Sequence, residues 1–128
     1  KIEIWKNTIL KILYEEKNKN NLILGYGASG RTNTILSYIN FYFDYIFDDS
    51  KYKIDNYIPY YHTKIYDSKE IYIISNIKTI FILAWPYSKD IIKKHKQFLN
   101  NGGKFIVILP SIIEITKDNY NTFFSSIK

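Results

Sequence analysis

Hydrophobic and polar positions form alternating blocks along the chain, and these blocks predict strands and helices in turn. Short apolar runs with an acidic, glycine or proline boundary are typical of buried strands, and they cover residues 22–25, 42–49, 79–85 and 104–110. Apolar residues at helical spacing predict an opening helix that the polar run 17–21 ends, a helix starting near Ser29, and a helix after Pro86 that residues 100–103 stop. A last short helix would be anchored by Phe123, Phe124 and Ile127, whereas residues 50–70 are polar, rich in tyrosine and expected to be irregular.

Strands that are almost continuously apolar and that alternate with helices are typical of a parallel sheet covered on both faces. No repeat or low-complexity linker interrupts the pattern. We therefore predict an α/β, Rossmann-like three-layer fold with a mostly parallel sheet, and a single domain over residues 1–128.

The composition narrows the function classes. The 128 residues include no Cys, which excludes a disulfide scaffold and a thiolate metal site, and no Met, so we interpret the chain as part of a longer protein. No apolar run approaches the ~20 residues that span a bilayer. The net charge of +6 comes from lysines that are spread along the chain rather than gathered. We expect a cytoplasmic protein without nucleic-acid or membrane partners.

The segment ILGYGASGRTNT, residues 23–34, carries the first candidate chemistry. Gly25, Gly27 and Gly30 have the G-x-G-x-x-G spacing of a dinucleotide-binding turn, and they follow a predicted strand and open a predicted helix. In such a turn the first glycine permits a tight strand exit, the second lets backbone N–H groups approach a diphosphate, and the third lets the helix pack near the strand. The helix N-terminus also favours anions.

An acidic residue supports the same interpretation. Asp48 ends the next predicted strand, 23 residues after Gly25, where dinucleotide-binding folds place a ribose-binding carboxylate. Two alternatives stay open: the glycine segment is a strand-to-helix turn that binds nothing tightly, and Asp48 has a capping or turn role. Asp48 and Asp49 adjoin in a strand, so their side chains should point to opposite faces and make a poor acid–base pair.

Longer motifs resemble the C-terminal domain of the sugar C-methyltransferase family, from about Leu22 to Pro110. The family's glycine turn reads roughly G-Y-G-A-x-A-K-G-N-T, followed by a strand-ending Asp, a K-x-x-x-Y-x-P-G-T stretch, a W-N pair and G-G-x-F-I-V-P-x-P. The matching residues here are Gly25, Tyr26, Gly27, Ala28, Asn33, Thr34, Asp48, Lys53, Tyr57, Pro59, Trp85, Gly102, Gly103, Phe105, Ile106, Val107 and Pro110.

The resemblance implies a specific function. Family members are tripartite enzymes with a zinc-binding region, a middle domain that binds S-adenosylmethionine, and this C-terminal domain; they methylate a carbon of a nucleotide-linked keto-deoxysugar. We thus expect the cofactor and the zinc site in domains absent from this chain, and no tightly bound cofactor, catalytic residue or metal here. The isolated domain should be inactive.

Departures from the family pattern at four positions bear on the site. Gly30 and Arg31 replace Ala and Lys in the glycine turn, Tyr60 replaces the Gly after Pro59, and Pro86 replaces the Asn after Trp85. The third glycine is therefore not a family feature, and ligand contacts at the other two loops should differ from those of the family.

Two histidines and several aromatic residues are further candidates for function. His62, in the polar loop, is expected to be a surface residue rather than a general base, and His95, on the inner face of a helix, to be a hydrogen-bonded core or edge residue. Trp85 follows a strand end, where it could stack on a ligand or cover the sheet edge. Tyrosines gather in the loop beyond Asp48 and suit a sugar site or a domain interface, namely Tyr52, Tyr57, Tyr60 and Tyr61.

The sequence thus predicts one wall of a nucleotide-sugar cleft, with the other domains of the methyltransferase as partners. The candidate substrate-binding residues are Gly25, Tyr26, Gly27, Ala28, Ser29, Gly30, Arg31, Asp48 and Trp85. A stand-alone nucleotide- or NAD-binding module, including an oxidoreductase fragment, remains an alternative, as does a non-catalytic interaction domain that uses the tyrosine-rich loop.

Overall fold

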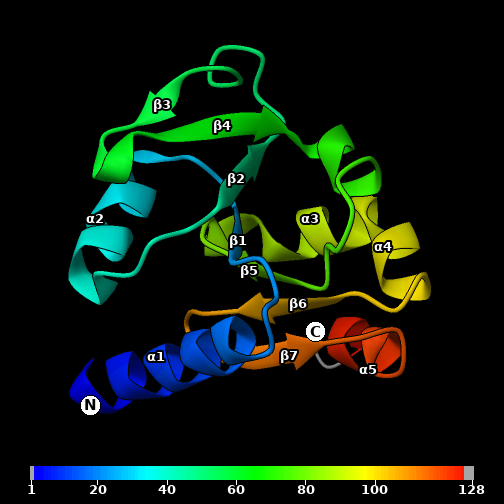
Figure 1. Cartoon of the computed structure of the whole chain (residues 1–128). Helices are drawn as coiled ribbons and strands as arrows, with labels where there is room; N and C mark the ends of the chain where they lie inside the picture. Colours follow the sequence, from blue (N-terminus) through cyan, green and yellow to red (C-terminus); the bar gives the residue numbers. More distant parts are fainter. Residues whose placement is uncertain (1, 126–128) are drawn as a thin grey trace.

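The computed structural model describes residues 2–125 and, within them, all side chains except that of Tyr61. The α-helices are α1 (Ile2–Asn18), α2 (Gly30–Ile39), α3 (Ser88–Lys94), α4 (Lys96–Asn100) and α5 (Tyr120–Ser125). The strands are β1 (Leu24–Tyr26), β2 (Tyr45–Asp48), β3 (Tyr57–Ile58), β4 (Thr63–Asp67), β5 (Thr79–Ile82), β6 (Lys104–Val107) and β7 (Ile113–Ile115) (Figure 1). Three short 3₁₀ helices join them, η1 (Tyr60–His62), η2 (Ser68–Tyr72) and η3 (Trp85–Tyr87).

The strands form one mostly parallel sheet in the order β3-β4-β2-β1-β5-β6-β7. The five central strands are parallel, and only the two edge strands, β3 and β7, run antiparallel to their neighbours. The prediction of an α/β fold with a mostly parallel sheet is confirmed.

Successive strand side chains point to opposite faces of the sheet, which explains the continuous apolar runs. Phe81 and Leu83 pack with α1 and α2 in one buried cluster, while Ile80 and Ile82 pack with α3 and α4 in the other. The same alternation separates Ile106 from Phe105 and Val107 on β6. Helices therefore cover both faces, as the three-layer prediction requires (Figure 1).

The chain reverses its direction of sheet growth between β1 and β5. From β1 it passes through α2 to β2 and then β4 on one side; later it passes from β5 through α3 and α4 to β6 on the other side. Open α/β sheets bind ligands outside the carboxyl ends of the strands at such a switch point. The turns after Tyr26 and Ile82 occupy this position.

Two expectations about the elements were wrong, and one strand was not expected. Residues 50–70 are not irregular throughout, because β4 pairs in parallel with β2, with Ile65 beside Ile46. The helix after Pro86 is broken at His95, which joins α3 to α4 with φ −109° and ψ 35°. Strand β7, which was not predicted, pairs with β6. A short last helix is confirmed as α5, but Ile127 lies outside the described residues.

Candidate functional site

Two adjoining pockets open at the switch point of the sheet. The first, of about 380 Å³, lies among the turn after β1, the end of β2, the turn after β5 and helix α3. Its polar and charged lining comprises Ser29, Asp48, Asp49, Lys53, Tyr87, Asp90 and Lys94, together with Tyr26 from the end of β1. We call it the carboxylate pocket.

The second pocket, of about 540 Å³, adjoins the first and is called the arginine pocket. It is lined by the start of α2, including Arg31 and Thr34, and by residues 83–87. Ser29, Ala84 and Tyr87 line both pockets and form the ridge between them. A single ligand lying across Ser29 and Tyr87 would reach both spaces.

Eight of the nine candidate residues line one pocket or the other. Tyr26, Gly27, Ala28, Ser29 and Asp48 border the carboxylate pocket, whereas Ser29, Gly30, Arg31 and Trp85 border the arginine pocket. The ninth, Gly25, is buried inside β1. Ligand contact by these residues stays a prediction.

The glycines have roles that differ from those expected from their spacing. A Cβ on Gly25 would stand 2.6 Å from Leu83 Cδ1 and 2.8 Å from Ile46 Cδ1, so this glycine makes room for core side chains of neighbouring strands. Gly27 has φ +110° and is pressed against the backbone of Ala84. A Cβ on Gly30 would meet no atom within 4 Å, so the expected close helix packing at the third glycine is wrong.

Hydrogen bonds inside the protein already use most amides of the glycine turn. The N–H of Gly27 donates to the Phe47 carbonyl at 2.7 Å, that of Ala28 to Asp48 Oδ2 at 2.7 Å, and that of Ser29 to Thr32 Oγ1 at 3.1 Å. The turn therefore does not present these three N–H groups to a diphosphate. Only the first turn of α2 retains donors of this kind, because the N–H groups of Gly30 and Arg31 have no intrahelical acceptor.

Asp48 holds the turn together. Besides the Ala28 amide, its carboxylate accepts the backbone N–H groups of Asp49 at 2.7 Å and Ser50 at 2.9 Å. Three backbone N–H donors thus hold this carboxylate within the turn. The geometry favours the turn role for Asp48 over the ribose-binding role.

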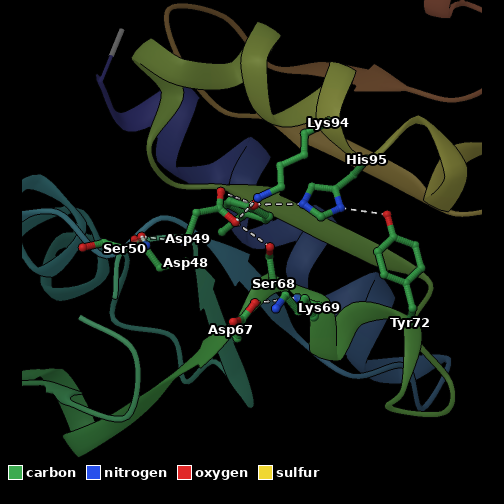
Figure 2. Close-up of polar contacts among 10 residues, drawn as sticks. Asp48, Asp49, Ser50, Asp67, Ser68, Lys69, Tyr72, Lys94 and His95 are labelled. Carbon is green, nitrogen blue, oxygen red and sulfur yellow. Dashed lines mark hydrogen bonds and ion pairs between the residues drawn. The ribbon is translucent and has the colours of Figure 1, made fainter. Parts of the chain in front are cut away.

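The neighbouring Asp49 follows the end of β2 and lines the same pocket as Asp48. Its carboxylate lies at the centre of a separate polar network (Figure 2). Its Oδ1 accepts from Ser68 Oγ at 2.5 Å and pairs with Lys94 Nζ at 2.7 Å, while its Oδ2 accepts from the Tyr26 hydroxyl at 2.6 Å. Partial burial tends to raise the pKa of Asp49, but the hydrogen bonds from Lys94, Ser68 and Tyr26 outweigh it and lower that pKa.

His95 extends this network into the protein. Its Nε2 lies 2.9 Å from the Tyr26 hydroxyl oxygen and its Nδ1 lies 2.7 Å from the Tyr72 hydroxyl. The imidazole is 3% exposed, which confirms the expectation of a hydrogen-bonded core residue, and burial lowers its pKa. Burial and the adjacent carboxylate raise the pKa of Tyr26 far above its ordinary value, and burial raises that of Tyr72.

Asp49, Lys94, His95 and Tyr72 were not among the candidate residues. They come from the end of β2, the α3–α4 junction and the end of η2, so only the fold brings them together (Figure 2). The one sequence signal was the placement of His95 on an inner helix face. His62, in contrast, is exposed, as expected.

The aromatic candidates have mixed surroundings. The Arg31 guanidinium lies 5.7 Å from the Trp85 ring centroid, within cation–π range, and Trp85 is half-buried against the core. Tyr60, at a position where the family pattern has Gly, donates its backbone N–H to Asn33 Oδ1 and its hydroxyl to Asn40 Oδ1. This loop is therefore fastened to α2. Tyr52 and Tyr57 are exposed, and the structure does not describe the side chain of Tyr61.

Within residues 2–125, no group of three or more His, Cys, Asp or Glu side chains lies close enough together to hold a metal ion. No helix in the same range has the length and apolar character needed to cross a membrane.

Comparison with known proteins places this chain in a family. A segment of 29 residues, 23% of this chain, is 55% identical to the C-methyltransferase NovU of Streptomyces niveus and spans 7% of that protein's length. The crystal structure of UDP-D-quinovosamine 4-dehydrogenase from Vibrio fischeri is similar over 77% of this chain and 96% of that chain, with a TM-score of 0.54 and 16% identity, which shows a shared fold alone. The C-methyltransferase C-terminal domain profile matches residues 1–110, and the chain therefore belongs to that family.

Proposed function

We propose that this chain acts as the C-terminal domain of an S-adenosylmethionine-dependent sugar C-methyltransferase and forms one wall of its nucleotide-sugar cleft. The family match over residues 1–110 and the local identity to NovU support methyl transfer to carbon. The observation that carries the substrate assignment is the pair of pockets at the switch point, which together offer an elongated polar ligand a path across the ridge formed by Ser29, Ala84 and Tyr87.

The arginine pocket suits the anionic part of such a ligand. Among the described residues that line it, Arg31 is the charged one and none is a carboxylate. The N–H groups of Gly30 and Arg31 at the start of α2 add donors for phosphate oxygens. Trp85 supplies a ring face beside the guanidinium, on which a base could stack. Arg31 replaces a lysine of the family pattern and keeps its positive charge.

The chemistry in this proposal is divided between domains. A base elsewhere in the enzyme would remove a proton next to the sugar ketone, and the resulting carbanion would take the methyl group. S-adenosylmethionine would supply that methyl group from another domain, and the residues of this chain are not assigned to hold it. This domain contributes by fixing the position of the sugar nucleotide, which reduces the entropic part of the barrier.

Geometry disfavours the dinucleotide-binding alternative. Its two signals were the glycine amides and the carboxylate of Asp48, and both are engaged by hydrogen bonds inside the protein. An NAD-binding module would need these groups free for the pyrophosphate and the ribose.

Calorimetric titration of the chain with dTDP-glucose, NAD⁺ and S-adenosylmethionine tests the proposal. We expect binding of dTDP-glucose, loss of that binding in Arg31→Met, and no effect of Lys11→Met, which removes the same charge from the exposed face of α1. NAD⁺ binding that Asp48→Asn abolishes would favour the dinucleotide module instead. Binding of S-adenosylmethionine to this chain would contradict the proposed division between domains.

A further inference from the structure

The carboxylate pocket has a charge pattern unlike that of its neighbour. Three carboxylates line it, those of Asp48, Asp49 and Asp90, against the two ammonium groups of Lys53 and Lys94, so its formal net charge is 2 − 3 = −1. A diphosphate would meet repulsion here. An uncharged ring that carries hydroxyl groups would not, because each hydroxyl both donates to a carboxylate and accepts from an ammonium.

Two of these groups keep hydrogen-bonding capacity toward the pocket. Lys94 Nζ gives one of its three N–H groups to Asp49 and has a half-exposed side chain. Asp49 Oδ1 accepts from Ser68 and Lys94, but its Oδ2 accepts only from Tyr26 among the recorded bonds of residues 2–125. The pair therefore offers both an acceptor and donors at the same place on the pocket wall.

A buried chain of hydrogen bonds fixes how this pair is oriented. Tyr26 has one hydroxyl proton, and it is donated to Asp49, so the Tyr26 oxygen must accept from His95 Nε2–H. Neutral His95 then has an unprotonated Nδ1, which accepts from the Tyr72 hydroxyl. Each member determines the proton position of the next, from half-exposed Tyr72 through 3%-exposed His95 and 2%-exposed Tyr26 to Asp49 at the pocket.

We propose, on the basis of the nucleotide-sugar function given above, that the carboxylate pocket holds the uncharged sugar ring and that Asp49 and Lys94 recognise its hydroxyl groups. Tyr26, His95 and Tyr72 are positioning residues for that pair. The sugar nucleotide then lies with its sugar beside α3 and its diphosphate beside Arg31, on opposite sides of the Ser29–Tyr87 ridge.

Adjacent lysines provide a matched test. Lys93 and Lys94 are both exposed residues of α3, but only Lys94 lines the pocket. By calorimetry we expect Lys94→Met to weaken dTDP-glucose binding about tenfold, the effect of one charged hydrogen bond, and to leave dTDP binding unchanged. Lys93→Met should change neither affinity.

The possible failures are distinct. Equal weakening of dTDP and dTDP-glucose by Lys94→Met would show an anion site and overturn the proposal, as would no effect on either probe. If the wild-type chain binds dTDP and dTDP-glucose with equal affinity, the sugar ring adds nothing to binding. That result would overturn the sugar-pocket proposal but not the proposed nucleotide-binding function. If the wild-type chain binds neither probe, the proposed function fails and this inference fails with it.

The positioning residues need a readout besides affinity. We expect ¹⁵N NMR of the imidazole to show the Nε2–H tautomer of His95 in the wild-type chain and a mixture of tautomers in Tyr72→Phe, with dTDP-glucose binding weakened two- to fivefold. Tyr52→Phe, on a fully exposed loop side chain, should alter neither measurement. An Nδ1–H tautomer in the wild-type chain, or unchanged tautomer and affinity in Tyr72→Phe, would contradict the positioning role.

Discussion

Gly27 lies against Ala84 so closely that a Cβ on the glycine would stand 2.8 Å from the Ala84 backbone nitrogen and 2.3 Å from its Cβ. The two residues follow β1 and β5, the parallel strands from which the chain adds further strands in opposite directions. This contact brings the two turns together and places them between the pockets. The glycine is needed for packing of backbone on backbone, whatever binds at the edge of the sheet.

Alanine substitution should therefore have opposite effects on stability at Gly27 and at Gly30. Gly27→Ala combines a positive φ with a backbone clash, and we expect it to lower the free energy of unfolding by about 3 kcal/mol or more. Gly30→Ala places its methyl in open space at the first residue of α2 and should stabilise the chain by about 0.5 kcal/mol. Urea denaturation of both variants measures the difference. Equal effects would contradict the separate roles of the second and third glycines.

Asp48 should act as a structural residue. Asp48→Ala removes the acceptor of three backbone N–H groups, and we expect a loss of about 2–3 kcal/mol in the free energy of unfolding. Asp90→Ala, at an exposed position of the same pocket, is the control and should change stability by less than about 0.5 kcal/mol. A fully stable Asp48→Ala variant would revive the ribose-binding role.

Acid should destabilise the chain through His95. Because burial lowers the pKa of His95 in the folded chain, the unfolded chain binds more protons as the pH falls below the ordinary histidine pKa of about 6.5. The stability that His95 contributes is thus present above that pH and declines below it, until the lowered folded pKa is passed. The lowered pKa of Asp49 extends the decline to more acidic solutions, below the ordinary aspartate pKa.

Thermal melts between pH 5.5 and 7.5 test this dependence. We expect the Tm of the parent chain to decrease as the pH is lowered from 7.5 to 5.5. His95→Gln should have a lower Tm than the parent chain and a Tm that depends less on pH. His62→Asn is the control, since His62 is exposed and has φ 50°, a backbone conformation that Asn tolerates. If His95→Gln keeps the parent slope, another group is responsible for it.

Alkali should act through the tyrosines. Burial raises the pKa of both Tyr26 and Tyr72, so the folded chain keeps these hydroxyls protonated when the unfolded chain has begun to lose them near pH 10. Their contribution to stability is present below pH 10 and is lost as the pH rises through the raised folded values. Denaturant melts at pH 8 and pH 11 should show this loss, and Tyr26→Phe should reduce it. An equal loss in Tyr26→Phe would contradict the assignment.

The apolar runs in the sequence predicted most of the strands in the centre of the sheet. The four apolar runs became β1, β2, β5 and β6, because strands buried on both faces must be apolar at nearly every position. Strand β4 was missed because it lies next to the edge of the sheet and carries only one aliphatic residue, Ile65, in a segment dominated by Lys, Tyr and Asp. The helix break at His95 was not predicted because no Gly or Pro lies at that point of the sequence.

The candidate residues lie around two pockets, but the hydrogen-bond partners of the glycine turn differ from those expected. The glycine spacing found the turn, since Gly25 makes room for core side chains and Gly27 for the backbone of Ala84. It could not show that Phe47, Asp48 and Thr32 would take the amides, because those partners depend on how α2 and β2 pack against the turn. Asp49 and Lys94 are 45 residues apart, and no sequence pattern links them.

The central claim is that a nucleotide sugar lies across the edge of the sheet at the switch point. Backbone amide NMR of the chain, titrated with dTDP-glucose, tests it most directly. The account predicts shift changes on both sides of the ridge, at Ser29 and Arg31 and at Tyr87 and Lys94. Changes confined to residues away from both pockets, such as the apolar groove beside Trp5 and Tyr38, or an unchanged spectrum at saturating ligand, would contradict it.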